Sequence, residues 1–147
     1  MLISTRGRYA LRVMCDLLEQ KEGEYIPLKE IAARQGISLK YLESIMKALV
    51  RDGLVEASSG RGGGYRLRRS GDRYQVGEIL RCTEGSLAPV ACVAEDAEFC
   101  DRQDACITFS LWEGLKEAID NYLDGITLQE LLERTRKCRK EADNHGN

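Results

Sequence analysis

The sequence predicts a mainly helical fold with one small β-hairpin. Residues 5–21 and 38–53 carry apolar side chains three and four positions apart, the spacing of helices that bury one face. Two short alternating stretches flank SSGRGGG, whose glycines favour a tight reversal of the chain. A further apolar repeat over residues 107–123 predicts a long helix nearer the C-terminus.

The first half has the pattern of a winged helix-turn-helix. Pro27 opens a short helix that ends at Gly36, and Ser38 is a favourable N-cap for the helix that follows. The tight GIS element joins these two helices at the steep angle of a helix-turn-helix. The hairpin after Gly53 would then be the wing. The predicted fold class is therefore mainly α: a winged helix-turn-helix with a small β-hairpin wing and a long C-terminal helix.

Three regions follow from this pattern. Residues 1–70 should form the DNA-binding domain. Residues 71–133 should contain a short helix at 76–82, a cysteine-bearing loop with little periodicity, and two further helices, the last opened by the capping box TLQE. We expect residues 134–147 to be a charged, disordered tail.

Charge is divided unevenly along the chain. Residues 1–70 carry a net charge of +5 and residues 71–147 a net charge of −7, which sum to the overall −2. A basic half suggests binding to a polyanion such as double-stranded DNA. The longest apolar run, residues 87–94, is too short to cross a bilayer, and arginines interrupt the N-terminal segment. We therefore expect a cytoplasmic protein that binds no membrane.

The second helix of a helix-turn-helix places its N-terminal residues near base edges in the major groove. Lysine and tyrosine there can hold phosphates, and glutamate can accept a hydrogen bond from a cytosine amino group. An arginine on a glycine-rich wing tip can enter a minor groove. The candidate DNA-binding residues are Ser38, Lys40, Tyr41, Glu43, Ser44 and, on the wing, Arg61.

Each candidate also has a purely structural interpretation. Tyr41 could pack against the core, and Glu43 could pair with Lys47 one helical turn away. The wing arginines could form a solvated edge. Together, however, the residues favour DNA binding.

Three of the six cysteines, Cys92, Cys100 and Cys106, lie within fifteen positions. Clustered cysteines in a cytosolic protein indicate metal binding or redox chemistry more than structural disulfides. Their spacing, C-x7-C-x5-C, is wider than the C-x2-4-C pairs of structural zinc sites. Soft thiolates select iron–sulfur clusters, zinc or Cu(I), and a bound metal would offset the carboxylates around them. These carboxylates are Glu95, Asp96, Glu98, Asp101 and Asp104.

The segments RGRYALRVM, IPLKEIAARQGISLKYLESIMKALVRDGLVEASSGRGGGYRL and CITFSLWEGL resemble the IscR/NsrR/CymR family of winged-helix regulators. Within that family the chain is closest to the IscR branch, which regulates iron–sulfur cluster biogenesis. The resemblance implies a homodimer held by the long helix, a palindromic operator, and a cluster on Cys92, Cys100 and Cys106, with [2Fe-2S] favoured over [4Fe-4S]. It also implies that Glu43 discriminates bases, and it makes cluster-delivery proteins possible partners.

The fourth cluster ligand does not match the family pattern. Phe109 stands where IscR has a histidine, and Arg8 stands where NsrR supplies an aspartate from the partner subunit. His145 lies in the expected tail, and Cys82 lies on an apolar helix where packing is the favoured role. An exogenous ligand or a nearby carboxylate remains, and the carboxylate candidates are Glu95, Asp96, Glu98, Asp101 and Asp104.

The wing also departs from the pattern, because Ser59 replaces the usual IscR arginine and Arg61 follows two residues later. We expect a transcription regulator, not an enzyme, whose DNA binding responds to an iron–sulfur cluster and whose targets include cluster-biogenesis genes and its own operon. The alternatives are a cluster-free thiol sensor or CymR-like repressor of cysteine metabolism, and a small redox or cluster-carrier protein. The last leaves the helix-turn-helix unexplained.

Overall fold

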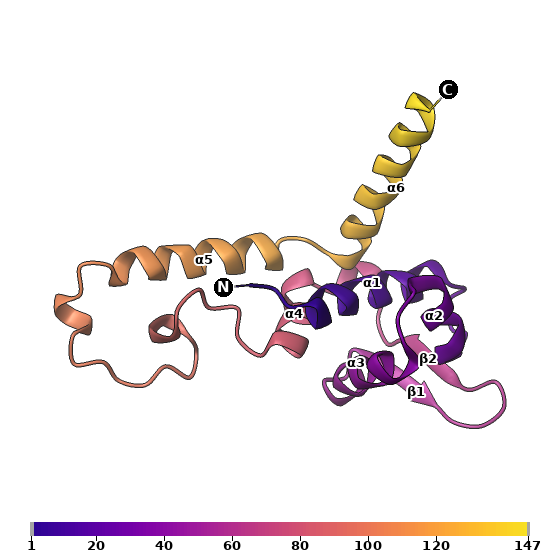
Figure 1. Ribbon diagram of the computed structural model, residues 1–147, viewed down its shortest axis with the longest axis horizontal. Coiled ribbons are helices and arrows are strands. Elements are labelled where there is room, and N and C mark those ends of the chain that lie inside the picture. The colour runs from indigo at the N-terminus through magenta and orange to yellow at the C-terminus, as the bar shows by residue number, and fades with distance from the viewer. Residues whose placement is uncertain (1, 147) are drawn as a thin grey trace.

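The computed structural model describes residues 2–146 and confirms the mainly helical fold with one two-stranded antiparallel hairpin (Figure 1). Three short 3₁₀ turns, at Gly71–Arg73, Ala91–Val93 and Gln103–Ala105, interrupt the connections. The principal elements are α1 (Thr5–Glu19), α2 (Leu28–Gln35), α3 (Leu39–Arg51), β1 (Val55–Ser58), β2 (Gly64–Leu67), α4 (Val76–Glu84), α5 (Phe109–Asp124) and α6 (Leu128–His145).

Local signals in the sequence set the helix-turn-helix. Helix α2 ends at Gly36, which adopts a left-handed φ of 64° that favours glycine. The Ser38 hydroxyl then caps α3 by accepting a hydrogen bond from the Tyr41 backbone N–H. In the wing, Val55 pairs with Leu67 and Ser58 with Gly64. The expected helix-turn-helix and wing are therefore present.

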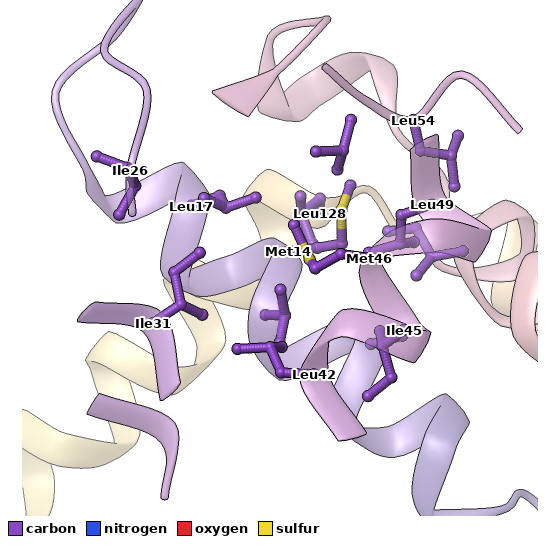
Figure 2. Packing of buried hydrophobic residues seen from close by; sticks show 14 of the residues in the cluster. Met14, Leu17, Ile26, Ile31, Leu42, Ile45, Met46, Leu49, Leu54 and Leu128 are labelled. Carbon is purple, nitrogen blue, oxygen red and sulfur yellow. The ribbon is translucent and has the colours of Figure 1, made fainter. Parts of the chain in front are cut away.

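One hydrophobic core joins the three N-terminal helices to the wing (Figure 2). Met14 from α1 and Met46 from α3 lie at its centre, both fully buried. Ile31 adds α2, and Leu54 adds the start of the wing. Burial of such side chains contributes about 1.5–3 kcal/mol each.

Residues from the second half of the chain complete the same core. Tyr74 is fully buried, and its hydroxyl donates a hydrogen bond of 2.6 Å to the Leu54 carbonyl while accepting from two backbone N–H groups of the strand end. Ile79 from α4 and Leu128 from α6 are also fully buried in it. The boundary expected at residue 70 therefore does not separate two cores.

Helix α5 extends away from this core and has no buried residue among those described (Figure 1). It starts at Phe109 rather than 107, and Ile107 before it is 96% exposed. Leu111, Leu115 and Tyr122 are also exposed apolar side chains. The segment of residues 92–106, which we call the cysteine loop, lies at the end of α5 remote from the core.

Helix α6 differs from the sequence expectation of a disordered tail after residue 133. The capping box between Thr127 and Glu130 opens the helix, and the helix continues through to His145. Arginine, lysine, glutamate and alanine in this stretch are strong helix formers, and Gly146 is the first glycine after Gly125. Among residues 2–146, none of the helices has the length and apolar character that crossing a membrane requires.

We predict that Leu128→Ala lowers the free energy of unfolding by about 2–5 kcal/mol, because Leu128 is fully buried and its loss leaves a cavity. Leu39→Ala removes the same atoms from a side chain that is 41% exposed, and should cost less than half as much. Urea denaturation followed by circular dichroism measures both. Equal losses in the two variants would contradict the placement of α6 in the core.

Candidate nucleic-acid interface and cysteine loop

The recognition helix α3 presents its predicted contacts on an exposed face. Lys40 and Glu43 are exposed, and within the described residues Glu43 forms no ion pair with Lys47. Ser38 is exposed as well, although its oxygen already accepts the capping hydrogen bond from Tyr41. Lys40 and Glu43 are thus free to meet a ligand.

Ser44 and Tyr41 are held by α1 instead of pointing freely outward. Arg6 donates to the Ser44 hydroxyl at 2.5 Å and to the Ser44 carbonyl at 3.0 Å. The Tyr41 ring packs edge-on against Tyr9, with ring centroids 5.8 Å apart. Helix α1 therefore fixes the rotation of the recognition helix. The Ser44 hydroxyl is already hydrogen-bonded within the protein, by Arg6.

A buried carboxylate anchors α1 to the end of α2, just before the turn. Asp16 is 4% exposed and accepts three hydrogen bonds from Arg34, of 2.8, 3.0 and 3.3 Å. Gln35 donates a fourth hydrogen bond of 2.7 Å to the same carboxylate. The hydrogen bond to Asp16 raises the pKa of Arg34 above its usual value. Removing the Arg34 side chain would be destabilising, because the Asp16 carboxylate would stay buried without its ion-pair partner.

The wing carries four arginines with different environments. Arg66 pairs with Glu56 at 3.1 Å, and Arg69 pairs with Glu78 at 2.7 Å. Both are therefore structural. Arg61 lies exposed at the tip between glycines with φ of 85° and 70°, and Arg68 is exposed further along the strand end. Arg61 and Arg68 are thus the two wing arginines that are exposed and form no ion pair among the described residues.

The cysteine loop holds its three thiols in solvent. Cys92, Cys100 and Cys106 are exposed free cysteines. Val93 is buried and places the start of the loop beside α5, next to Phe109 and Glu113. Within residues 2–146, no three His, Cys, Asp or Glu side chains lie close enough together to form a ready metal site. The thiols therefore do not form a preassembled site in this conformation.

The pKa values of three cysteines are shifted by their surroundings, in opposite directions. Hydrogen bonds from the Thr108 side chain and backbone lower the pKa of the Cys106 thiol, and its Sγ lies 3.6 Å from Thr108 Oγ1. Burial raises the pKa of Cys82 to about 12, and its thiol donates to the Ala48 carbonyl at 3.3 Å. Burial also raises the pKa of Cys15 to about 11. Cys82 and Cys15 therefore pack, and Cys106 is the readier thiolate.

The structure does not select a fourth ligand. The five candidate carboxylates are all exposed in the loop. Phe109 begins α5, and Arg8 is exposed on α1 and donates to Thr5. His145 bonds the Glu141 carbonyl at the far end of α6, and Cys138 is exposed on that helix. The carboxylate candidates are Glu95, Asp96, Glu98, Asp101 and Asp104.

Sequence reasoning missed the residues of α1 that position the recognition helix. Arg6 and Ser44 are 38 residues apart, and Asp16 and Arg34 are 18 apart. The one available signal was Asp16 itself, a charged residue on the apolar face of a predicted helix. Such a residue requires a buried partner.

The chain is similar to known transcription regulators over most of its length. A model of the Rrf2 family, described as "Iron-dependent Transcriptional regulator", matches residues 3–134. The HTH-type transcriptional regulator IscR of Xenorhabdus nematophila is 40% identical over 133 residues, which span 90% of this chain and 79% of that protein. Its counterpart in Escherichia coli strain HS is 36% identical over 132 residues.

Solved structures agree with these sequence matches. CymR, the global cysteine regulator of B. subtilis, has 35% sequence identity and a TM-score of 0.72 over 91% of this chain and 98% of its own. IscR of T. potens has 33% identity and the same TM-score over 94% of this chain and 90% of its own. The resemblance found in the sequence motifs is thereby confirmed, and the relatives are regulators rather than enzymes.

We predict that Cys82 and Cys15 react with iodoacetamide at pH 8 at least about a hundredfold more slowly than Cys138 in the folded apoprotein. Their raised pKa values leave little thiolate at that pH, and burial hinders access. Mass spectrometry of tryptic peptides measures each rate. In 8 M urea the three rates should converge. Fast alkylation of Cys82 in the folded protein would contradict its packing role.

Proposed function

This chain belongs to the Rrf2 family of DNA-binding transcriptional regulators, and we propose that it acts as a homodimer whose DNA affinity responds to an iron–sulfur cluster. The observation that carries this proposal is the set of three exposed, free thiols on one loop that leads directly into α5. By similarity to IscR, the proposed targets are cluster-biogenesis genes, including its own operon.

The residues of the loop fit an iron–sulfur cluster in chemistry. Cys92, Cys100 and Cys106 are soft ligands, and their exposure leaves them accessible to incoming iron and sulfide. Hydrogen bonds already favour the thiolate form of Cys106. When bound, a cluster supplies a redox-sensitive centre whose presence depends on cluster supply. The loop would have to draw its thiols together to hold it, so binding would order this segment.

DNA reading is assigned to α3 and the wing. Lys40 and Arg61 supply exposed cations for phosphate or minor-groove contact, and Glu43 supplies an exposed acceptor for a base edge. Arg6 and Tyr9 hold α3 at the angle from which these side chains project. A homodimer would place two such helices on the two halves of a palindromic operator.

A homodimer is supported by the exposed apolar face of α5. Leu111 is 59% exposed, and Leu115 lies one turn further on the same face. Tyr122 extends the exposed apolar surface toward the C-terminal end of the helix. Leu111, Leu115 and Tyr122 belong to neither hydrophobic cluster of the described residues, and an amphipathic face of this kind is suited to pack on a second copy.

Helix α4 supplies a physical connection from α5 to the recognition helix. Arg81 on α4 pairs with Asp120 at 2.8 Å and Asp124 at 2.7 Å on α5. The next residue, Cys82, donates to the Ala48 carbonyl on α3. A change in the placement of α5 would therefore be transmitted through α4 and would shift the position of α3. We propose that ordering of the cysteine loop changes the relative placement of the two recognition helices, and so favours one class of operator over another.

A second candidate function is a cluster-free, thiol-based regulator. The structural likeness to the cysteine regulator CymR and the lowered pKa of Cys106 favour it. Iron and sulfide content separates the two candidates.

We predict that Glu43→Ala relaxes discrimination at one base pair of each half-site by about 1–3 kcal/mol. Arg61→Ala should instead weaken binding to all duplexes, and should lower by about 1 the slope of the logarithm of the binding constant against the logarithm of salt concentration. Fluorescence anisotropy against an operator selected from random duplexes measures both. Glu19→Ala, which removes an exposed carboxylate from α1, is the matched control. Unchanged base preference in Glu43→Ala would contradict its assignment.

We predict that anaerobic reconstitution gives a coloured protein with stoichiometric iron and sulfide, and that Cys100→Ala abolishes the colour. Cys138→Ala removes another exposed thiol, outside the loop, and should keep it. Visible absorption with iron and sulfide counts per chain provides the measurement. Replacement of each candidate carboxylate by its amide would then identify the fourth ligand. A colourless, iron-free wild type would favour the thiol-based regulator instead.

A further inference from the structure

The part of α6 beyond Leu132 projects from the body (Figure 1). From Glu133 to His145 every residue is exposed, and this part carries five cations against three carboxylates, Glu133, Glu141 and Asp143. Residues 134–140, which we call the basic segment, contain five cations and no carboxylate, and within the described chain none of the five forms an ion pair. Arg136 and Lys140 are one turn apart and repel each other. The five cations are Arg134, Arg136, Lys137, Arg139 and Lys140.

The cysteine loop is the opposite case. It carries five carboxylates and one cation, Arg102, and all of these charges are exposed without an ion pair among the described residues. The loop and the basic segment therefore have net charges of −4 and +5.

The two segments are kept apart within one chain. The cysteine loop precedes the start of α5 at Phe109, and α6 follows its end at Asp124. Helix α5 has 16 residues, so the two segments are separated by its length of about 24 Å. Figure 1 shows the loop and α6 at opposite ends of the molecule. Neither segment can neutralise the other without a second copy.

Charge then decides how two copies pair along α5. A parallel pairing would place the basic segments side by side and the acidic loops side by side, which like-charge repulsion opposes. An antiparallel pairing brings the loop of each copy to the α5 end from which the other copy's α6 departs. A two-fold axis makes this contact twice, as isologous interfaces do.

We infer that the basic segment of α6 is a docking surface for the acidic cysteine loop of a second copy of this chain. Arg136, Arg139 and Lys140 lie three and four residues apart and so share one helical face for this contact. The inference rests on the homodimer of the proposed function and adds the second contact that fixes its geometry. Through this contact the α6 helix of the partner subunit would restrict the position of the loop that carries the three thiols.

The test is sedimentation equilibrium of the reduced apoprotein at low and high salt. The α6 variant carries Arg136→Glu, Arg139→Glu and Lys140→Glu, and the loop variant carries Glu95→Lys, Glu98→Lys and Asp101→Lys. We expect each to raise the dimer dissociation constant about tenfold or more at low salt, with a smaller effect at high salt. The variant that combines both sets should return to within about threefold of wild type.

A matched control reverses three exposed cations elsewhere, with Lys21→Glu, Lys29→Glu and Arg73→Glu, and should dimerise like wild type. A dimeric wild type with an α6 variant no weaker than this control would overturn the docking contact alone. Failure of the combined variant to recover would overturn the pairing of these two segments. A wild type that stays monomeric would overturn the homodimer itself, and the docking contact with it.

Discussion

The geometry of the helix-turn-helix depends on one buried charge, the carboxylate of Asp16. Arg34 and Gln35 both bind it at the last residues of α2, so the turn into α3 starts from a fixed point on α1. Arg6 then holds α3 at Ser44, further along the same helix. Helix α1 therefore acts as the frame of the helix-turn-helix, and its polar residues matter as much as its apolar face.

The periodic and capping signals were sufficient to predict most of the fold, because they act within a few residues. Gly36 and Ser38 marked the turn, and the glycines marked the wing. The contacts between distant residues could not be predicted. Nothing local distinguishes Arg66 and Arg69, which are paired, from Arg61, which is free. The segment after residue 133 is charged, which led us to expect disorder, yet α6 continues through it to His145, because arginine, lysine, glutamate and alanine are strong helix formers.

The cysteines show the same division between local and distant information. The spacing of Cys92, Cys100 and Cys106 singled them out, and their exposure agrees with a role outside the core. The packing of Cys82 followed from the apolar helix that carries it. The fourth ligand could not be predicted, because the five carboxylates of the loop are equivalent in sequence and all remain exposed.

The burial of Tyr74 and Leu128 in the same core as Met46 limits where this chain can be divided into stable fragments. A fragment that ends at residue 70 would lack the side chains that close its interior, and it would expose an apolar surface to water. The DNA-binding half of the chain is therefore not an independently folding domain. Fusion proteins and natural recombinants that exchange sensing segments in this fold must transfer the chain through the first turns of α6, or the winged helix itself will not hold together.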